Sequence, residues 1–450
     1  MPLRILSLGA ILIVCLGSSL AVAADFCHFG WSFHSTFNGY RYRHGGGVND
    51  GQLYIWGGTT SAYKRKDLQV YDPAADQWTA LLDMPDVKAN FGFAVAGGYL
   101  YAIGGEGPIS RETRSYRYDL LYGTWTTIAN YPADNPVLIG MVCSDADGST
   151  VYCFGGMEPS AIIPKPVTIG FVYSPDADEW TPIADLPAGL GFGYAAYYQG
   201  RIYATGGYPM EDETYAFDPV NNVWETLPSP SARHAPVLSA AGELLWLAGG
   251  GDVWDESIVA DQYFDFNSWS DVGTSFNPPR IAAVGGYIPG FGIFVAGGVG
   301  ANNEAGSDDT FLWHICVPHI TAVEPAAGTP GTPFIIAAET YEATVTGYLY
   351  DETDQVYPIE DYQVVDATQI QGQIPSDLPA GTYGLALIGS LGQIGRFDAA
   401  FTIPGDDDTA DDDQADDDQT DDDQSSDDDN DDDSSDDDND NNDDGGGCGC

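Results

Sequence analysis

Basic residues are scarce in this chain of 450 residues. It holds 15 Lys and Arg against 68 Asp and Glu, which gives a formal net charge of −53. Proteins that bind nucleic acid need a basic patch to neutralise phosphates, and this composition offers none. The sequence therefore argues against nucleic acid as a partner. Residues 405–450 contain 24 aspartates and no Lys or Arg, so much of the negative charge is concentrated at the C-terminal end.

Long apolar runs are absent after the first 24 residues, which argues against a membrane-spanning helix. Met1–Ala24 has a lone Arg4, a largely apolar stretch at Ile5–Leu16, and small residues before Asp25. This pattern is typical of a secretory signal peptide that is removed on export. We expect an exported protein, extracellular or on the cell surface, with the periplasm as the alternative compartment.

Histidine and cysteine are also few. The six histidines form no cluster with the spacing of a metal site, so we expect no metal centre and no tightly bound cofactor. Six cysteines follow the signal peptide, an even number in an oxidising compartment. Cys143 and Cys153 lie on either side of a turn at 145–148 and are predicted to form a disulfide across a hairpin. The alternative is a pair of buried thiols.

Glycine, in contrast, recurs in pairs that close short apolar and aromatic runs. Successive pairs are about fifty residues apart, a period typical of radially repeated β-sheets. Strands crowd near the axis of such an array, and this crowding is a reason to expect glycine there. The six pairs are Gly57-Gly58, Gly104-Gly105, Gly155-Gly156, Gly206-Gly207, Gly249-Gly250 and Gly297-Gly298.

Each repeat continues with an aromatic residue, a turn and a tryptophan. Trp78 follows Tyr71 by seven residues, and the spacing recurs at Trp125, Trp180 and Trp224. A constant spacing across an Asp- and Pro-rich turn predicts a hairpin of fixed register. With one further strand before each glycine pair, the sequence predicts four strands in each of six units and hardly any helix.

This pattern resembles the kelch repeat over about Cys27 to Cys316. The resemblance implies an all-β fold, a six-bladed kelch β-propeller at residues 25–317. The sixth repeat lacks its tryptophan strand, and Gly30-Trp31-Ser32 has the missing pattern. We therefore expect the N-terminal segment to complete the last blade, where a Cys27–Cys316 disulfide would lock the closure.

Two segments follow. Residues 318–404 show short alternating strands with Pro and Gly turns, which predict a small β-sandwich. Their opening and Leu378–Tyr383 resemble the immunoglobulin-like IPT/TIG family.

The last segment, residues 405–450, has almost no apolar content and is predicted to be a disordered Asp-rich tail. Two interpretations stay open for it, weak Ca²⁺ association and a solvated spacer. Its end carries Cys448 and Cys450, resembling bacterial sorting signals with a Gly-Cys pair, which suggests surface attachment.

The candidate ligand-binding residues lie at the start of the innermost strands and should surround one mouth of the central channel. A cationic mouth would attract a carboxylated or sugar ligand. The alternative is that these arginines bind loop carbonyls between blades. Acids in the loops after the glycine pairs, Glu106, Glu112, Glu211, Glu213 and Glu256, could serve a sugar-processing enzyme. The candidates at the mouth are Arg43, His44, Arg233, His234 and Arg280.

These features favour an exported binding or adhesion protein that recognises a protein or glycan through propeller loops. We predict no catalytic residue. The alternative is a carbohydrate-processing enzyme similar to the exported kelch-type sialic-acid mutarotases, which need only a positioned acid and base. Copper chemistry like that of galactose oxidase is disfavoured, because that family takes a ligand from a C-terminal histidine and none follows His319.

Overall fold

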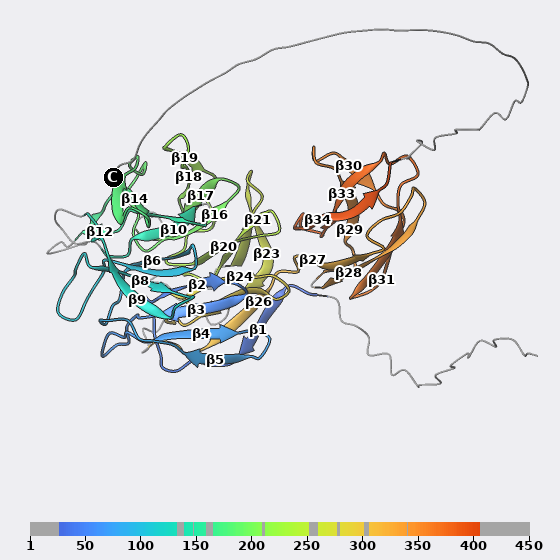
Figure 1. Cartoon of the computed structure of the whole chain (residues 1–450). Coiled ribbons are helices and arrows are strands. Elements are labelled where there is room, and N and C mark those ends of the chain that lie inside the picture. The colour runs from blue at the N-terminus through green and yellow to red at the C-terminus, as the bar shows by residue number, and fades with distance from the viewer. Residues whose placement is uncertain are drawn as a thin grey trace, which may run out of the picture. The chain divides into compact units, whose positions relative to one another are not determined.

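The computed structural model describes residues 27–132, 139–146, 148–158, 165–208, 212–251, 260–276, 280–300, 306–339 and 341–405. All of these lie in the first of the chain's two units, Met1–Gly405. The described residues form strands and turns without a helix, as an all-β prediction requires (Figure 1). The expected signal peptide and the Asp-rich tail with Cys448 and Cys450 lie outside the described residues.

Six antiparallel sheets of four strands each make up the first part of the described chain. The first three are β2 (Gly45–Asn49), β3 (Gln52–Trp56), β4 (Leu68–Asp72), β5 (Gln77–Ala80); β6 (Gly92–Ala96), β7 (Tyr99–Ile103), β8 (Ser115–Asp119), β9 (Thr124–Ile128); and β10 (Val142–Ala146), β11 (Thr150–Phe154), β14 (Gly170–Ser174), β15 (Glu179–Pro182). The next three are β16 (Tyr194–Tyr198), β17 (Arg201–Thr205), β18 (Thr214–Asp218), β19 (Val223–Leu227); β20 (Val237–Ala241), β21 (Leu244–Ala248), β22 (Ala260–Phe264), β23 (Trp269–Ser275); and β24 (Val284–Ile288), β25 (Gly292–Ala296), β26 (Thr310–His314), β1 (Gly30–His34). A short pair, β12 (Met157–Glu158) and β13 (Lys165–Pro166), projects from the third sheet.

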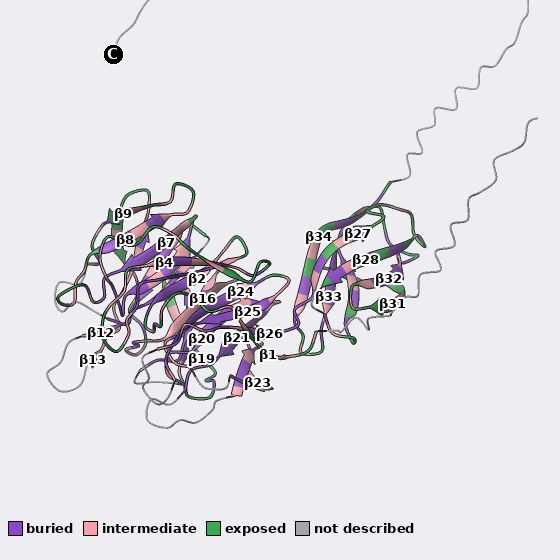
Figure 2. Cartoon of the chain, turned by 90° about the horizontal axis from the view of Figure 1, so that it is seen from below, coloured by how far each residue is buried: buried purple, intermediate pink, exposed green. Residues whose placement is uncertain are grey.

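The six sheets close into a circle, which we call the sheet ring. The first strand of each sheet contacts the first strand of the next, and β24 of the last sheet contacts β2 of the first. Among the second strands, β21 and β25 are buried along their whole length, and β3, β7 and β17 along all but their first residue (Figure 2). Neighbouring sheets therefore enclose apolar cores between them, as a β-propeller does.

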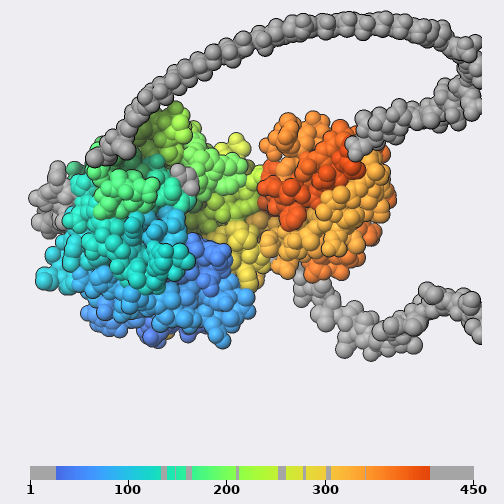
Figure 3. Space-filling view, in the orientation of Figure 1, coloured from blue at the N-terminus to red at the C-terminus, as the bar shows by residue number. Residues whose placement is uncertain are grey.

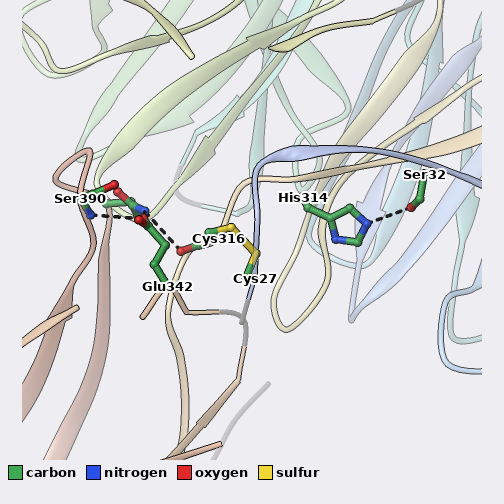
Figure 4. Close-up of a disulfide and its surroundings, with 7 residues drawn as sticks. Cys27, Ser32, His314, Cys316, Glu342 and Ser390 are labelled. Carbon is green, nitrogen blue, oxygen red and sulfur yellow. Dashed lines mark hydrogen bonds between the residues drawn. A yellow bond between two sulfur atoms is a disulfide. The ribbon is translucent and has the colours of Figure 1, made fainter. Parts of the chain in front are cut away.

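The N-terminal strand completes the sixth sheet. β1 pairs antiparallel with β26, and Trp31 lies opposite Trp313. A disulfide joins Cys27 to Cys316 beside this pairing, and Ser32 Oγ lies 2.9 Å from His314 Nε2 (Figure 4). The described structure thus has the arrangement that the Trp31 pattern predicts.

The recurrent tryptophans bind each sheet to the one before it. Trp125 Nε1 donates to the carbonyl of Leu82, which follows the last strand of the preceding sheet, at 2.8 Å. The same contact recurs from Trp180 to the carbonyl of Ala129 at 3.0 Å. The fixed spacing of the tryptophans therefore reflects a hydrogen bond between sheets as well as the register of a hairpin.

The glycine pairs have a different role from the one expected. Gly57 and Gly58 have φ of 63° and 93°, in the left-handed region that favours glycine. Gly58 N–H donates to the carbonyl of Lys88, in the linker of the next sheet, at 2.7 Å. The pairs thus contact a neighbouring linker in a tight turn. Crowding at the axis instead explains Gly47 in β2, because a Cβ there would lie 2.6 Å from Val95 Cγ2.

The last described part is a sandwich of two four-stranded sheets, drawn orange to red in Figure 3. Side chains from both sheets, among them Ile336 and Leu385, share one buried core. The strands are β27 (His319–Glu324), β28 (Pro333–Glu339), β32 (Gln369–Gln373), β31 (Glu360–Asp366) in one sheet and β30 (Val356–Pro358), β29 (Thr346–Tyr350), β33 (Gly381–Ile388), β34 (Ile394–Ile403) in the other.

Candidate functional site

Six linkers meet at one end of the axis, each just before the first strand of its sheet. At one position in every linker the backbone has φ between 45° and 63°, although only one of the six residues is glycine. Left-handed backbone in other residues is uncommon and persists where the surroundings hold it in place. We call these six residues the axial circle: Arg43, Asn90, Gly140, Phe192, Ala235 and Ala282.

Backbone hydrogen bonds between linkers hold the axial circle. Arg43 N–H donates to the carbonyl of Ala282 at 3.1 Å, and Asn90 N–H donates to that of Arg43 at 3.1 Å. Gly140 N–H then donates to Asn90 at 2.8 Å, and Phe192 N–H to Gly140 at 2.8 Å. The circle is therefore a rigid frame that fixes which side chains face the axis.

The residues that occupy equivalent positions in different linkers are not the ones that the sequence pattern suggested. Isolated bridges pair Tyr42 with Thr59 and His234 with Gly251, so Tyr42 and His234 occupy the same place in their linkers. The counterpart of Arg233 is consequently Arg41, and Arg43 corresponds to Ala235. The shared Arg-His dipeptide had suggested an alignment that is shifted by two residues.

Arg233 faces the protein interior, which corrects the expectation that it surrounds the mouth. Its side chain is fully buried and donates to the carbonyls of Gly249 at 3.2 Å and Ala260 at 2.8 Å. Burial lowers the pKa of Arg233 to about 10. A ligand at the mouth cannot reach this guanidinium, and it serves as a hydrogen-bond donor to loop carbonyls.

Two further buried cations share this role and were not among the predicted residues. Arg41 Nη1 donates to the carbonyl of Gly57 at 3.2 Å, and Lys88 Nζ donates to that of Gly104 at 2.7 Å. In both cases, as for Arg233, the acceptor lies 16 residues further along the chain, at the first glycine of a pair. That constant offset is a sequence signal that could have identified the group.

His44 is also buried, although it is among the residues that line a small cavity at the axial circle. Only 2% of its surface is exposed, and its Nδ1 lies 3.1 Å from the carbonyl oxygen of Gly45. Burial, with a smaller effect from the nearby Arg41 charge, lowers the pKa of His44 to about 3. The imidazole is therefore neutral at physiological pH, and its contacts are structural.

Arg280 and His234 occupy intermediate positions. Arg280 Nη2 forms an ion pair with Asp309 Oδ2 at 2.9 Å, and its side chain is 10% exposed. The His234 imidazole lies 6.0 Å from the phenyl ring of Phe192, measured between centroids. His234 thus borders the mouth, whereas the charge of Arg280 is neutralised by Asp309.

Arg43 is the one predicted cation that is exposed. Its guanidinium lies over the phenyl ring of Phe192 at 5.5 Å and over Tyr42 at 5.6 Å. Phe192 was not among the predicted residues, because its linker carries no Arg or His to mark it. A cation stacked on an aromatic ring at the axis is positioned to bind an acidic or polar group.

A small cavity of about 60 Å³ lies at the axial circle. It is lined by Arg43, Phe192 and Asn90, among others, and its described lining contains no carboxylate. Asn90 is 6% exposed, and its Oδ1 is buried without a hydrogen-bond partner among the described residues. The cavity therefore offers both donors, on Arg43, and an unused acceptor, on Asn90.

A second cavity of about 260 Å³ opens at the other end of the axis. Its walls are the first strands of the six sheets and include Tyr194, Ser239 and Asp145. Tyr194 is fixed in place, since its hydroxyl donates to the carbonyl of Gly285 at 2.9 Å. The cavity at this end has polar groups in its lining but none of the predicted Arg and His residues.

Two of the loop acids that an enzyme would need are engaged in ion pairs. Glu106 lies 3.7 Å from Lys64, and Glu112 pairs with the buried Lys88 at 2.7 Å. Glu211 and Glu256 lie outside the described residues. The backbone carbonyl of Glu213 accepts a hydrogen bond from Thr205 at 2.9 Å. No described acid is placed beside the cation of Arg43.

The remaining predicted features concern disulfides, metals and membrane spans. Cys143 lies opposite Cys153 in the β10–β11 hairpin, and the two form a disulfide. Within the described ranges, no group of His, Cys, Asp or Glu could hold a metal ion. The same part of the chain contains no helix long and apolar enough to cross a membrane.

Repeated four-stranded sheets around an axis define a propeller-type repeat protein. A kelch motif matches residues 40–85. The chain is 26% identical to Kelch-like protein 35 of Mus musculus over 213 residues, 44% of this chain and 35% of that protein. It is 29% identical to Kelch-like protein terF of Aspergillus terreus over 259 residues, 51% of this chain and 54% of that protein. Alpha-scruin of Limulus polyphemus is 28% identical over 217 residues, 45% of this chain and 23% of that protein.

These matches support a kelch-repeat family for this chain, and the repeats are consistent with a β-propeller. The chain spans between about a quarter and a half of the length of these three relatives.

Proposed function

We propose that this chain is an exported binding protein in which a six-bladed kelch propeller recognises a protein partner through the axial circle. In this proposal the sandwich is an immunoglobulin-like domain of the IPT/TIG type, and the Asp-rich tail is a spacer or tether. Binding is a role that kelch repeats often perform. The signal-peptide pattern of Met1–Ala24 and the two disulfides support export, since disulfides persist in oxidising compartments.

One observation supports the assignment of the binding site to the axial circle. Arg43 presents an exposed guanidinium stacked on Phe192, and Asn90 Oδ1 lines the same cavity with no described partner. A buried acceptor without a hydrogen bond is costly and is relieved by a ligand that donates to it. The partner group should therefore both accept from Arg43 and donate to Asn90, as an amide or a protonated acid at the tip of a partner loop does.

The same chemistry fits a carboxylated sugar, so a glycan is the second candidate ligand. The enzyme alternative lacks support at this cavity, because its described lining offers no carboxylate to act as acid or base. We therefore place binding ahead of catalysis for the axial circle.

Arrays of cell-surface proteins and of neutral and carboxylated glycans, probed with the mature chain, would test the proposal. We expect ligands whose binding weakens by about tenfold or more in Arg43→Glu and Asn90→Leu variants. Arg201→Glu is the matched control, because Arg201 begins β17 at the opposite end of the axis. Equal binding by all variants would refute the site. Anomer interconversion of sialic acid that disappears in Arg43→Glu would favour the enzyme instead.

A further inference from the structure

A cavity of the sandwich lies where β29, β30, β33 and β34 end or turn. Its volume is about 610 Å³. We call it the tyrosine cleft and define it by six of its lining residues: Tyr350, Asp351, Glu352, Tyr357, Tyr383 and Asp398. Nothing in the proposed role of the axial circle uses these residues.

An irregularity in the sheet shapes one wall of the cleft. The register between β33 and β34 shifts between Tyr383 and Leu385, and Ala399 in β34 has φ of 50°. Bulges of this kind redirect side chains. Here Asp398 accepts a hydrogen bond from the Tyr350 hydroxyl at 2.5 Å. The bulge thus aims a carboxylate at the cleft.

The opposite wall holds a second pair of tyrosine and carboxylate. The Tyr357 hydroxyl donates to Asp351 Oδ2 at 3.0 Å, and the ring of Tyr357 meets that of Tyr383 edge to face at 5.7 Å. Tyr383 is only 4% exposed, so its ring packs against the core. The walls are therefore fixed aromatic surfaces, each with an anion beside it.

The cleft carries negative charge without a compensating base. Its lining includes Asp351, Glu352 and Asp398, and none of its lining residues is Lys, Arg or His. Hydrogen bonds from Thr353 lower the pKa of Asp351, which keeps that carboxylate ionised. The nearest cation, Arg396, lies on the Tyr350 ring at 4.7 Å, but its guanidinium is paired with Glu243 and, at 3.2 Å, with Asp354.

We propose that the tyrosine cleft binds a lysine or arginine side chain of a second protein. Aromatic rings attract cations through their faces, and carboxylates beside them provide the ion pair. The lining of the cleft has three carboxylates and no charged donor, which favours a positively charged ligand over a neutral sugar. Residues 406–450 of this chain contain no Lys or Arg, so this segment does not supply the cation.

A crosslinking experiment would test this proposal on the mature full-length chain. The probe is a short glycine-rich peptide with one lysine and one photoreactive residue, compared with the same peptide carrying norleucine in place of lysine. We expect the lysine peptide to crosslink within residues 346–403, as mapped by mass spectrometry, and the norleucine peptide not to. The Asp-rich tail attracts the lysine peptide in every sample, so the decisive comparison is between variants of the cleft, which all carry the same tail.

Matched variants isolate the charge and the rings. Glu352→Gln with Asp398→Asn should reduce this crosslinking by about tenfold, whereas Glu324→Gln with Glu339→Gln, which removes two charges of the same sandwich outside the cleft, should not. Tyr357→Phe should retain the crosslink and Tyr357→Leu should lose it. Equal crosslinking of the norleucine peptide, an unchanged yield in the double cleft variant, or protection by a neutral oligosaccharide would overturn the proposal.

Discussion

The buried His44 should make the sheet ring less stable in mild acid. In the unfolded chain a histidine has a pKa near 6.5, and in the folded protein burial lowers the pKa of His44 to about 3. The unfolded state therefore takes up a proton as the pH falls below 6.5, and the folded state does not. A lowered histidine pKa thus reduces the free energy of unfolding progressively between pH 6.5 and 3.

The magnitude follows from the same shift. Each pH unit inside that window removes about 1.4 kcal/mol, so moving from pH 7.5 to 5.0 should reduce the free energy of unfolding by about 2 kcal/mol through His44 alone. Burial also lowers the pKa of His314, with a contribution from the neighbouring His34, and this adds a loss of the same sign.

Urea unfolding at pH 7.5 and 5.0 would measure this loss. Tryptophan fluorescence reports on the sheet ring, because every tryptophan of the sequence precedes residue 317. The variant is His44→Asn, whose amide can replace Nδ1 beside the Gly45 carbonyl. We expect its stability to fall by about 2 kcal/mol less than that of the unmodified chain over this pH interval. The exposed His28, replaced by Asn, is the matched control.

The result that would refute this reasoning is an equal loss of stability in the unmodified chain and in His44→Asn. A lower stability of His44→Asn at both pH values would not support the reasoning, since an equal loss at both values would report only altered packing. The difference between the two pH values is the quantity that depends on the buried imidazole.

Three other predictions concern the frame of the sheet ring. Arg233→Gln should lower the free energy of unfolding by about 2 to 4 kcal/mol, because it leaves buried carbonyls without donors. The exposed Arg43, replaced by Gln, is the control and should change the free energy of unfolding by less than about 0.5 kcal/mol. Urea unfolding of the two variants measures the difference. Replacing both Cys27 and Cys316 with serine should cost about 5 kcal/mol on a chain-entropy estimate, and unchanged melting would contradict the closure. Trp125→Phe keeps an aromatic side chain but loses the hydrogen bond to the Leu82 carbonyl of the preceding sheet. Thermal unfolding should therefore show a stability lower by about 1 kcal/mol.

Much of the fold could be predicted from the sequence because its signals are local and repeated. The spacing from Tyr71 to Trp78 encodes a hairpin, and Gly30-Trp31-Ser32 repeats the pattern of a fourth strand, so β1 could be placed beside β26. An all-β chain with kelch repeats follows from these features alone.

The site could be predicted only in part, because it depends on which residues share a place in different linkers. Arg43-His44 and Arg233-His234 look alike in sequence, but the bridges of Tyr42 and His234 show that they are offset by two residues. Phe192 gave no signal, since its position at the axis comes from the left-handed backbone of its linker. The tyrosine cleft depends on a bulge in β34, which no periodicity in the sequence reveals.

The pairing of β1 with β26 sets the order of events during synthesis. The two cysteines beside that pairing are 289 residues apart. The first strand of the domain, β1, can therefore pair only after β26, the last strand of the sheet ring, has been synthesised. Until then the first strand of the domain has no partner strand in the sixth sheet. Assembly of this domain is therefore completed only after its last strand has been synthesised, which makes its closure a contact of high sequence separation and a late step of folding.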